Sequence, residues 1–167
     1  MDTMGQEKKP NLYLDVDGVF FGLYGDPCSY QLRPGANSFM LWAAERFNCK
    51  WLTCWGEDQL LGKTNDQKQR ETAGFMTLGY SHVATEFEYV NWRRMPPRWS
   101  GGRWGDKIDA IDVPNEDFYW LEDGIGAEAE EVLKKHGKLN RYLYIDERGE
   151  DGLIVARRWL EAVKIIR

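Results

Sequence analysis

Residues 12–20, "LYLDVDGVF", place two carboxylates in one of the most apolar stretches of the chain. The part from Leu12 to Asp17 has the continuous apolar character of a strand that is covered on both faces of a sheet. Asp15 and Asp17 lie two residues apart in it, and Gly18 follows directly. Because burial of an unpaired carboxylate is costly, we expect cations to lie beside these two residues.

The remaining sequence alternates strand and helix patterns. Further strands are predicted over residues 50–55, 118–124 and 141–147, with a weak one near 85–90, and helices over residues 36–47, 127–137 and 152–166. Between them, the sequence indicates a loop or hairpin over 18–35, a partly helical segment over 57–74, an irregular segment over 91–104 and a short helix over 107–112. This alternation predicts an α/β fold with a doubly wound, mostly parallel sheet, which is a Rossmannoid architecture.

Length and composition are typical of a globular protein with one domain. A chain of 167 residues, 43% hydrophobic and 29% charged, predicts a single domain over residues 1–167 with a polar, flexible tail over residues 1–11. The net charge of −5 argues against a large sequence-independent nucleic-acid surface but leaves a local basic patch open. Three cysteines without a CxxC pair indicate reduced thiols, and no stretch of 18 apolar residues is present. We therefore expect a cytoplasmic protein that spans no membrane and has no obligate protein partner.

Polar side chains follow three of the predicted strands. They are Asp15 and Asp17 after the first strand, Thr53 after the second, and Glu122 and Asp123 at the end of the strand over 118–124. Because ligands bind beyond the carboxyl ends of the strands in such sheets, we expect these side chains to meet in one crevice. Carboxylates that meet repel one another unless a cation compensates, and oxygen ligands with open water positions suit Mg2+. An aspartate nucleophile beside Mg2+ can form an aspartyl phosphate, whose phosphoryl oxygens Thr53 and Lys107 could hold.

In order and spacing, these residues resemble the four motifs of the haloacid dehalogenase-like (HAD) superfamily of phosphatases and phosphotransferases. The motifs are "DVDGV" over residues 15–19, "WLTCW" with Thr53, Lys107 ahead of the acidic strand, and the pair Glu122-Asp123. The resemblance extends over about residues 12–160. Lys63 and Lys68 are the other candidates for the third motif, but both lie before the irregular segment. The fourth motif has Glu first, where Asp or Gly is commoner.

The resemblance implies a small, Mg2+-dependent phosphatase of the HAD type. It implies that Asp15 is the nucleophile, that Asp17 is the general acid and base, that Thr53 and Lys107 bind the phosphoryl group, and that Glu122 pairs with Lys107. It also implies that Mg2+ is held by the Asp15 side chain, the Asp17 backbone carbonyl and Asp123.

Substrate choice in this superfamily usually comes from cap insertions after the first motif or between the second and third. The two intervals, residues 18–35 and about residues 57–104, are too short for a full cap domain beside the elements they must supply. We therefore expect an open site without a full cap, suited to large substrates such as a phosphorylated nucleic-acid end as well as to small phosphate esters. The pair Gly152-Leu153 at the start of the last helix resembles small HAD domains associated with RNA repair.

The segment from residue 91 to 104 interleaves arginine with tryptophan. Its basic and aromatic residues are Arg93, Arg94, Arg98 and Arg103 with Trp92, Trp99 and Trp104. Such a set suits stacking on a base and pairing with phosphate, so Arg93, Arg94 and Arg98 are candidate substrate-binding residues. The alternative is a surface loop that its tryptophans fix to the core.

Other interpretations stay open beside the phosphatase. A calcium loop would need an acid or Asn at residue 19 and Gly at residue 20, where Val19 and Phe20 stand. A HAD fold that binds Mg2+ and a phosphorylated partner with little turnover is the main alternative from another class. Phosphotransfer to an acceptor other than water would use the same residues.

Overall fold

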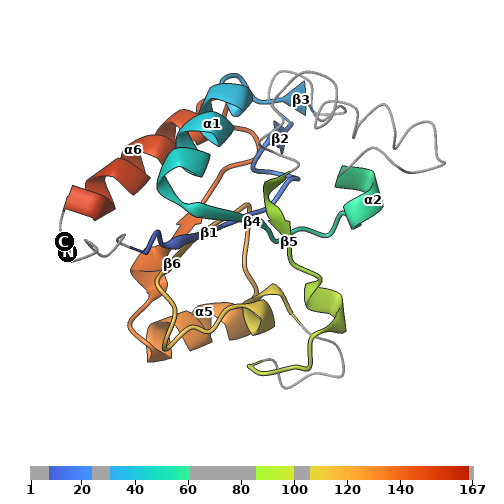
Figure 1. Cartoon of the computed structure of the whole chain (residues 1–167), viewed down its shortest axis with the longest axis vertical. Helices are drawn as coiled ribbons and strands as arrows, with labels where there is room; N and C mark the ends of the chain where they lie inside the picture. The colour runs from blue at the N-terminus through green and yellow to red at the C-terminus, as the bar shows by residue number, and fades with distance from the viewer. Residues whose placement is uncertain (1–7, 24–30, 61–85, 100–105, 166–167) are drawn as a thin grey trace, which may run out of the picture.

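A parallel sheet forms the centre of the computed structural model, which describes residues 8–23, 31–60, 86–99 and 106–165 (Figure 1). Within these residues the sheet has five strands: β1 (Asn11–Leu14), β4 (Asn48–Trp51), β5 (Glu88–Tyr89), β6 (Phe118–Glu122) and β7 (Tyr142–Tyr144). Their spatial order is β5-β4-β1-β6-β7, and every neighbouring pair is parallel. The predicted α/β fold with a doubly wound parallel sheet is confirmed.

The strand order reverses at β1. From β1 the chain adds β4 and then β5 on one side, and it returns to add β6 and β7 on the other side. In open α/β sheets, ligands bind outside the carboxyl ends of the strands at such a reversal. The ends of β1 and β6 are therefore the place where this fold favours a site.

Helices cover both faces of the sheet. Helices α1 (Ala36–Arg46) and α6 (Gly152–Ile165) lie together over one face, and α5 (Ala127–Lys135) lies over the other (Figure 1). Leu12 and Leu14 of β1 belong to the core cluster on the α1 and α6 side, whereas Tyr13 belongs to the cluster on the α5 side. Because side chains alternate between two buried faces, the strand is a continuous apolar run in the sequence.

Short elements surround the carboxyl ends of the strands. They are α2 (Glu57–Leu60), the 3₁₀ helices η1 (Trp92–Arg94) and η2 (Lys107–Ala110), and the antiparallel pair β2 (Phe21–Gly22) and β3 (Gln31–Leu32). A third 3₁₀ helix, η3 (Leu139–Arg141), leads into the amino end of β7. The pair β2 and β3 agrees with the hairpin expected within residues 18–35. Most of the segment over residues 57–74, which was expected to be partly helical, lies outside the described residues. The same is true of residues 61–85, on which the expectation of no full cap also depends.

Element bounds differ from the predicted ones where the backbone turns. Strand β4 ends at Trp51, although the apolar pattern predicted a strand to residue 55. After Leu52 the chain bends, and the Thr53 hydroxyl oxygen accepts a hydrogen bond from the Trp55 backbone N–H at 3.2 Å. Strand β1 begins at Asn11, which the sequence analysis assigned to the tail. Among the helices in the described part of the chain, none has the length and apolar character needed to cross a membrane.

Candidate active site

Three carboxylates from two strands meet at the reversal of the strand order. Leu14 of β1 lies opposite Leu121 of β6, so the residues that follow them, Asp15 and Glu122, become neighbours. Asp123 comes directly after β6. One carboxylate oxygen from each of Asp15, Glu122 and Asp123 lies within 4.8 Å of the other two, and Asp15 and Glu122 are buried. The fold thus forms an acidic cluster that could hold a metal ion.

Lys107 lies between two carboxylates of this cluster. Its Nζ is 2.8 Å from Asp15 Oδ2 and 2.7 Å from Glu122 Oε2. All three side chains are largely removed from solvent, with exposed fractions of 12%, 6% and 4% for Lys107, Asp15 and Glu122. The second oxygen of Asp15, Oδ1, accepts a hydrogen bond from the Val16 backbone N–H at 2.7 Å. Both oxygens of Asp15 are therefore fixed in position.

Helix η2 positions Lys107, and a buried aspartate holds that helix. Asp106 and Asp109 form a capping box at the start of η2, in which Asp109 Oδ2 accepts a hydrogen bond from the Asp106 N–H at 2.7 Å. Asp109 Oδ1 accepts further hydrogen bonds from the backbone N–H groups of Arg98 at 2.8 Å and Trp99 at 2.5 Å. Asp109 thus ties the segment before η2 to the helix that carries the lysine.

Burial and mutual repulsion shift the titration of this cluster. Burial, together with the hydrogen bond and charge of Asp15, raises the pKa of Glu122 well above its usual value. Burial raises the pKa of Asp123, a hydrogen bond with Glu122 lowers it and the charge of Asp15 raises it, so that the net shift is upward. Burial alone would lower the pKa of Lys107, but the charges of Asp15 and Glu122 outweigh burial and raise it. The raised pKa values favour the neutral forms of Glu122 and Asp123. With all three carboxylates ionised, the cluster would carry more negative charge than Lys107 neutralises, so a bound cation would compete with protons for these oxygens.

Asp17 lies beside the cluster and is only half-buried. Its Oδ2 accepts a hydrogen bond from the Trp55 indole N–H at 2.9 Å. Burial raises the pKa of Asp17, the bond from Trp55 lowers it, and the charge of Asp15 raises it further, so that the net shift is upward. An aspartic acid with a raised pKa holds a proton more readily, as a proton donor requires.

A cavity of about 540 Å³ opens beside these residues. Its acidic wall consists of Asp15, Asp17, Asp106, Glu122, Asp123 and Glu128, and Lys107 is the one cation among the described residues that line it. Trp92, Trp120, Ile125 and Cys54 supply apolar or weakly polar surface. The cavity thus has a floor of acidic side chains and a wall of aromatic ones.

Gly18 is required by its backbone and by a close contact. Its φ is +72°, a left-handed conformation that favours glycine, and a Cβ at this position would lie 2.2 Å from Asp123 Cβ. The Gly18 carbonyl also accepts a hydrogen bond from the buried Arg33 guanidinium at 2.7 Å. The glycine after the two aspartates thus lets the β1 loop approach Asp123.

We expect Gly18→Ala to destabilise the fold by about 2 kcal/mol or more, because it adds left-handed strain to a clash with Asp123. The matched variant is Gly137→Ala, since Gly137 also has a positive φ of +66° but nothing lies within 4 Å of an added Cβ. Urea unfolding of the two variants measures the loss of unfolding free energy in each. The loss in Gly137→Ala reports the backbone strain alone, and the additional loss in Gly18→Ala reports the contact with Asp123. Equal losses of stability in both would contradict the close contact with Asp123.

Thr53 lies in the turn after β4 and is buried. Its backbone carbonyl accepts a hydrogen bond from the Trp92 indole N–H at 2.9 Å, while its hydroxyl oxygen accepts one from the Trp55 N–H. Cys54, its neighbour, lines the cavity, and Thr53 itself is not among the lining residues. The structure thus puts Thr53 outside the cavity lining, bonded to Trp92, which lines the cavity, and to Trp55, which does not.

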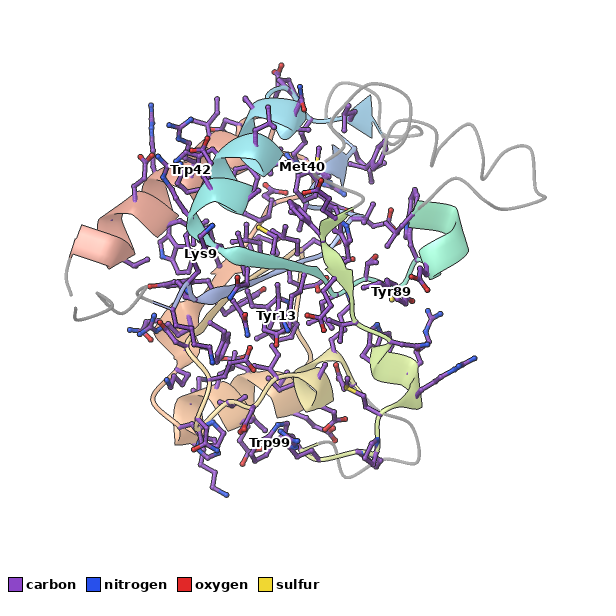
Figure 2. The ribbon with its side chains drawn as sticks, in the orientation of Figure 1. Lys9, Tyr13, Met40, Trp42, Tyr89 and Trp99 are labelled. Atoms are coloured by element: carbon purple, nitrogen blue, oxygen red, sulfur yellow. The ribbon has the colours of Figure 1, made fainter. Side chains whose placement is uncertain are left out.

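The arginine and tryptophan segment divides into two parts. Arg93 and Arg94 in η1 are exposed, and the Arg93 guanidinium lies 5.2 Å from the centroid of the Trp92 ring, which itself lines the cavity. Trp99 instead donates its indole N–H to the Ile111 carbonyl at 3.1 Å and lies beside α5 (Figure 2).

Arg98 lies next to Trp99, and the side chain of Arg98 approaches Asp112 at 3.8 Å. Trp99 therefore fixes the segment to the core, as the alternative interpretation expected, whereas the part around Trp92 borders the cavity. Arg103 and Trp104 lie outside the described residues.

Sequence reasoning did not single out Trp55 and Arg33. Trp55 contacts Asp17 over 38 positions of sequence, and the Arg33 guanidinium joins the Gly18 carbonyl to the Asp146 carbonyl, each at 2.7 Å. Trp55 does lie two residues after Thr53, so the second motif was a signal for its position. For Arg33 the sequence holds no such signal.

Comparison of the sequence with protein-family models and with curated proteins finds no match. The parallel α/β fold and the buried acidic cluster at its strand reversal are therefore the features that bear on function.

Proposed function

We propose that this protein is a Mg2+-dependent phosphomonoester hydrolase of the HAD type, which acts through an aspartyl phosphate on Asp15. The observation that carries the proposal is the buried arrangement of Asp15, Lys107 and Glu122 beside Asp123 at the strand reversal. It supports the resemblance to that superfamily for three of the four motifs, because the motif residues that follow or belong to β1, η2 and β6 come together in space.

The donor set fits a Mg2+ ion. All its candidate ligands are oxygen atoms, and the lysine leaves excess negative charge among them. Following the resemblance, we assign the metal to the Asp15 and Asp123 side chains with the Asp17 backbone carbonyl, and we assign Glu122 to the pair with Lys107, which lies 2.7 Å away. Mg2+ bound there would neutralise negative charge on the phosphoryl oxygens of the substrate.

The proposed reaction has two halves, in which Asp15 and Asp17 exchange roles. Asp15 attacks phosphorus, the bond from phosphorus to the ester oxygen breaks, and this oxygen takes the proton of the Asp17 carboxyl group. The Asp17 carboxylate then takes a proton from water as that water attacks the aspartyl phosphate. Inorganic phosphate leaves, and both aspartates return to their starting forms. Lys107 would hold the phosphoryl oxygens during both halves. The resemblance gives the Thr53 hydroxyl the same role, although Thr53 does not line the cavity in this structure.

The first test is hydrolysis of p-nitrophenyl phosphate with and without Mg2+. We expect turnover in Mg2+ and its loss in EDTA, and we expect Asp123→Ala to raise the Mg2+ concentration needed for half-maximal rate by about tenfold or more. Ca2+ should inhibit, because its larger and looser coordination shell disturbs the in-line geometry. Hydrolysis that resists EDTA would overturn the metal assignment. Mg2+ and phosphate binding without hydrolysis would favour the binding-protein alternative.

The aromatic wall and the nearby arginines support a phosphorylated nucleic-acid end as substrate, beside smaller phosphate esters. We expect an Arg93→Ala/Arg94→Ala/Arg98→Ala variant to raise KM for a phosphorylated oligonucleotide by about tenfold, which equals about 1.4 kcal/mol of binding, with kcat unchanged. The salt dependence of binding should fall by about one unit of slope for each phosphate contact removed.

The control substrate is p-nitrophenyl phosphate, which is too small to reach the arginines and should react as with the unaltered protein. The control variant is Arg157→Ala on α6, whose side chain pairs with Glu161 at 3.0 Å. Unchanged oligonucleotide kinetics in the triple variant would mean that the segment is structural throughout.

A further inference from the structure

Trp55 is fixed by contacts of its ring and its backbone, and its indole N–H donates a hydrogen bond to Asp17. Its ring stacks on Phe21 of β2 with a centroid distance of 6.0 Å and an interplanar angle of 17°. Its backbone N–H donates to the Thr53 hydroxyl oxygen, and its backbone carbonyl accepts a hydrogen bond from the hydroxyl of Tyr89 in β5 at 3.0 Å. The indole ring therefore has a fixed position from which its N–H meets Asp17 Oδ2 at 2.9 Å.

We propose that Trp55 is a positioning residue that orients the Asp17 carboxyl group for proton transfer, an inference that rests on the proposed function. The indole N–H is a donor only, so Oδ2 must present a lone pair to it. In the acid form of Asp17, the carbonyl-type oxygen is the better acceptor, so the bond to Oδ2 favours the form with the proton on Oδ1. Trp55 thus decides which of the two oxygens carries the proton that the ester oxygen receives.

The affected step is the first half of the reaction. When Asp15 attacks phosphorus, the bond to the ester oxygen breaks and the proton on Asp17 Oδ1 moves to that oxygen. An alkyl alcohol is a poor leaving group without this proton, whereas p-nitrophenolate leaves readily without it. Loss of a residue that orients the Asp17 carboxyl group must therefore slow the hydrolysis of alkyl phosphates far more than that of p-nitrophenyl phosphate. A residue that only stabilises the fold affects both substrates alike.

The test compares kcat/KM for ethyl phosphate and for p-nitrophenyl phosphate in Trp55→Phe. The ratio kcat/KM reports on the steps up to release of the alcohol, so slow water attack in the second half does not obscure it. We expect kcat/KM for ethyl phosphate to fall by about tenfold to a hundredfold, a part of the effect typical of a general acid, and that for p-nitrophenyl phosphate to change by less than about twofold. Phenylalanine keeps the stack on Phe21 while it removes the N–H.

The matched control is Trp99→Phe, which removes an indole hydrogen bond to the Ile111 carbonyl away from the cavity and should leave both rates unchanged. If Trp55→Phe does not fold, Tyr89→Phe replaces it, since loss of the hydroxyl bond to the Trp55 carbonyl should shift the two substrates in the same unequal direction.

Equal losses for both substrates, or no loss, would overturn the role of Trp55 while the proposed function stands. An unaltered protein that hydrolyses neither ester would overturn the proposed function and this inference together.

Discussion

Asp15→Asn is expected to abolish hydrolysis of phosphate esters while the fold persists. The amide has nearly the shape of the carboxylate but cannot attack phosphorus, so kcat should fall by about a thousandfold or more. The Asp15 side chain is bonded to the Val16 N–H and to Lys107, and an amide oxygen can still accept one of these bonds. Steady-state rates with p-nitrophenyl phosphate in saturating Mg2+ measure the effect, and thermal unfolding checks the fold.

A carboxylate at the opposite end of the neighbouring strand β6 is the matched control. Asp117 directly precedes β6 and pairs with Arg141 at 3.4 Å, so Asp117→Asn makes the same chemical change far from the cluster. It should leave the rate unchanged. Retention of more than a few per cent of the rate in Asp15→Asn would exclude Asp15 as the nucleophile.

Lys107→Met is expected to give the largest loss of stability among the substitutions considered. Methionine has a similar length but no charge, so two buried carboxylates lose the cation between them. Removal of one partner from a buried ion pair typically costs about 3–5 kcal/mol, because the remaining charge is left uncompensated. Urea unfolding at pH 8 without added metal measures the loss of unfolding free energy.

A second substitution tests the cause of that loss. Lys107→Met/Glu122→Gln removes one of the two uncompensated charges, so the double variant should be more stable than Lys107→Met alone. The loss should also depend on pH. The charge and hydrogen bond of Lys107 lower the pKa of Glu122, so without the lysine that pKa rises further in the folded state. A carboxyl group with a raised pKa stabilises the fold at low pH and loses that contribution as pH rises above the ordinary carboxyl range. Lys107→Met should therefore be more stable at pH 5 than at pH 8. A double variant less stable than Lys107→Met would contradict the ion-pair account.

Local sequence pattern predicts the sheet well for physical reasons. Leu12, Tyr13 and Leu14 are all buried because α1 and α6 cover one face of β1 and α5 covers the other. The strand is therefore a continuous apolar run that can be recognised in the sequence. The carboxyl ends of parallel strands meet at one edge, and for that reason Asp15, Glu122 and Asp123 could be expected together before any coordinates. Pattern is weaker at strand ends, as the early end of β4 at Trp51 shows.

Contacts over long sequence separations could not be predicted in this way. Trp55 reads as one more apolar residue of a strand, yet it leaves the sheet and bonds to Asp17. Arg33 reads as a loop residue, yet its guanidinium is buried between two backbone carbonyls. Gly152, part of the pair that opens α6, has a structural reason as well, since a Cβ there would lie 2.9 Å from Arg33 Nη1. Each of these depends on which loops meet in space, and sequence spacing does not encode that.

The most direct measurement of the proposed mechanism is capture of the aspartyl phosphate. Asp17→Asn cannot activate water, but p-nitrophenolate needs no acid to leave, so this variant should accumulate phosphorylated Asp15. We expect a stoichiometric burst of p-nitrophenolate in Mg2+, followed by very slow turnover. Borohydride reduction of the quenched protein and mass spectrometry of the peptide with residues 12–20 should then find the modification at Asp15. A protein that turns over p-nitrophenyl phosphate without a burst, or that carries phosphate on a residue other than Asp15, would contradict the account.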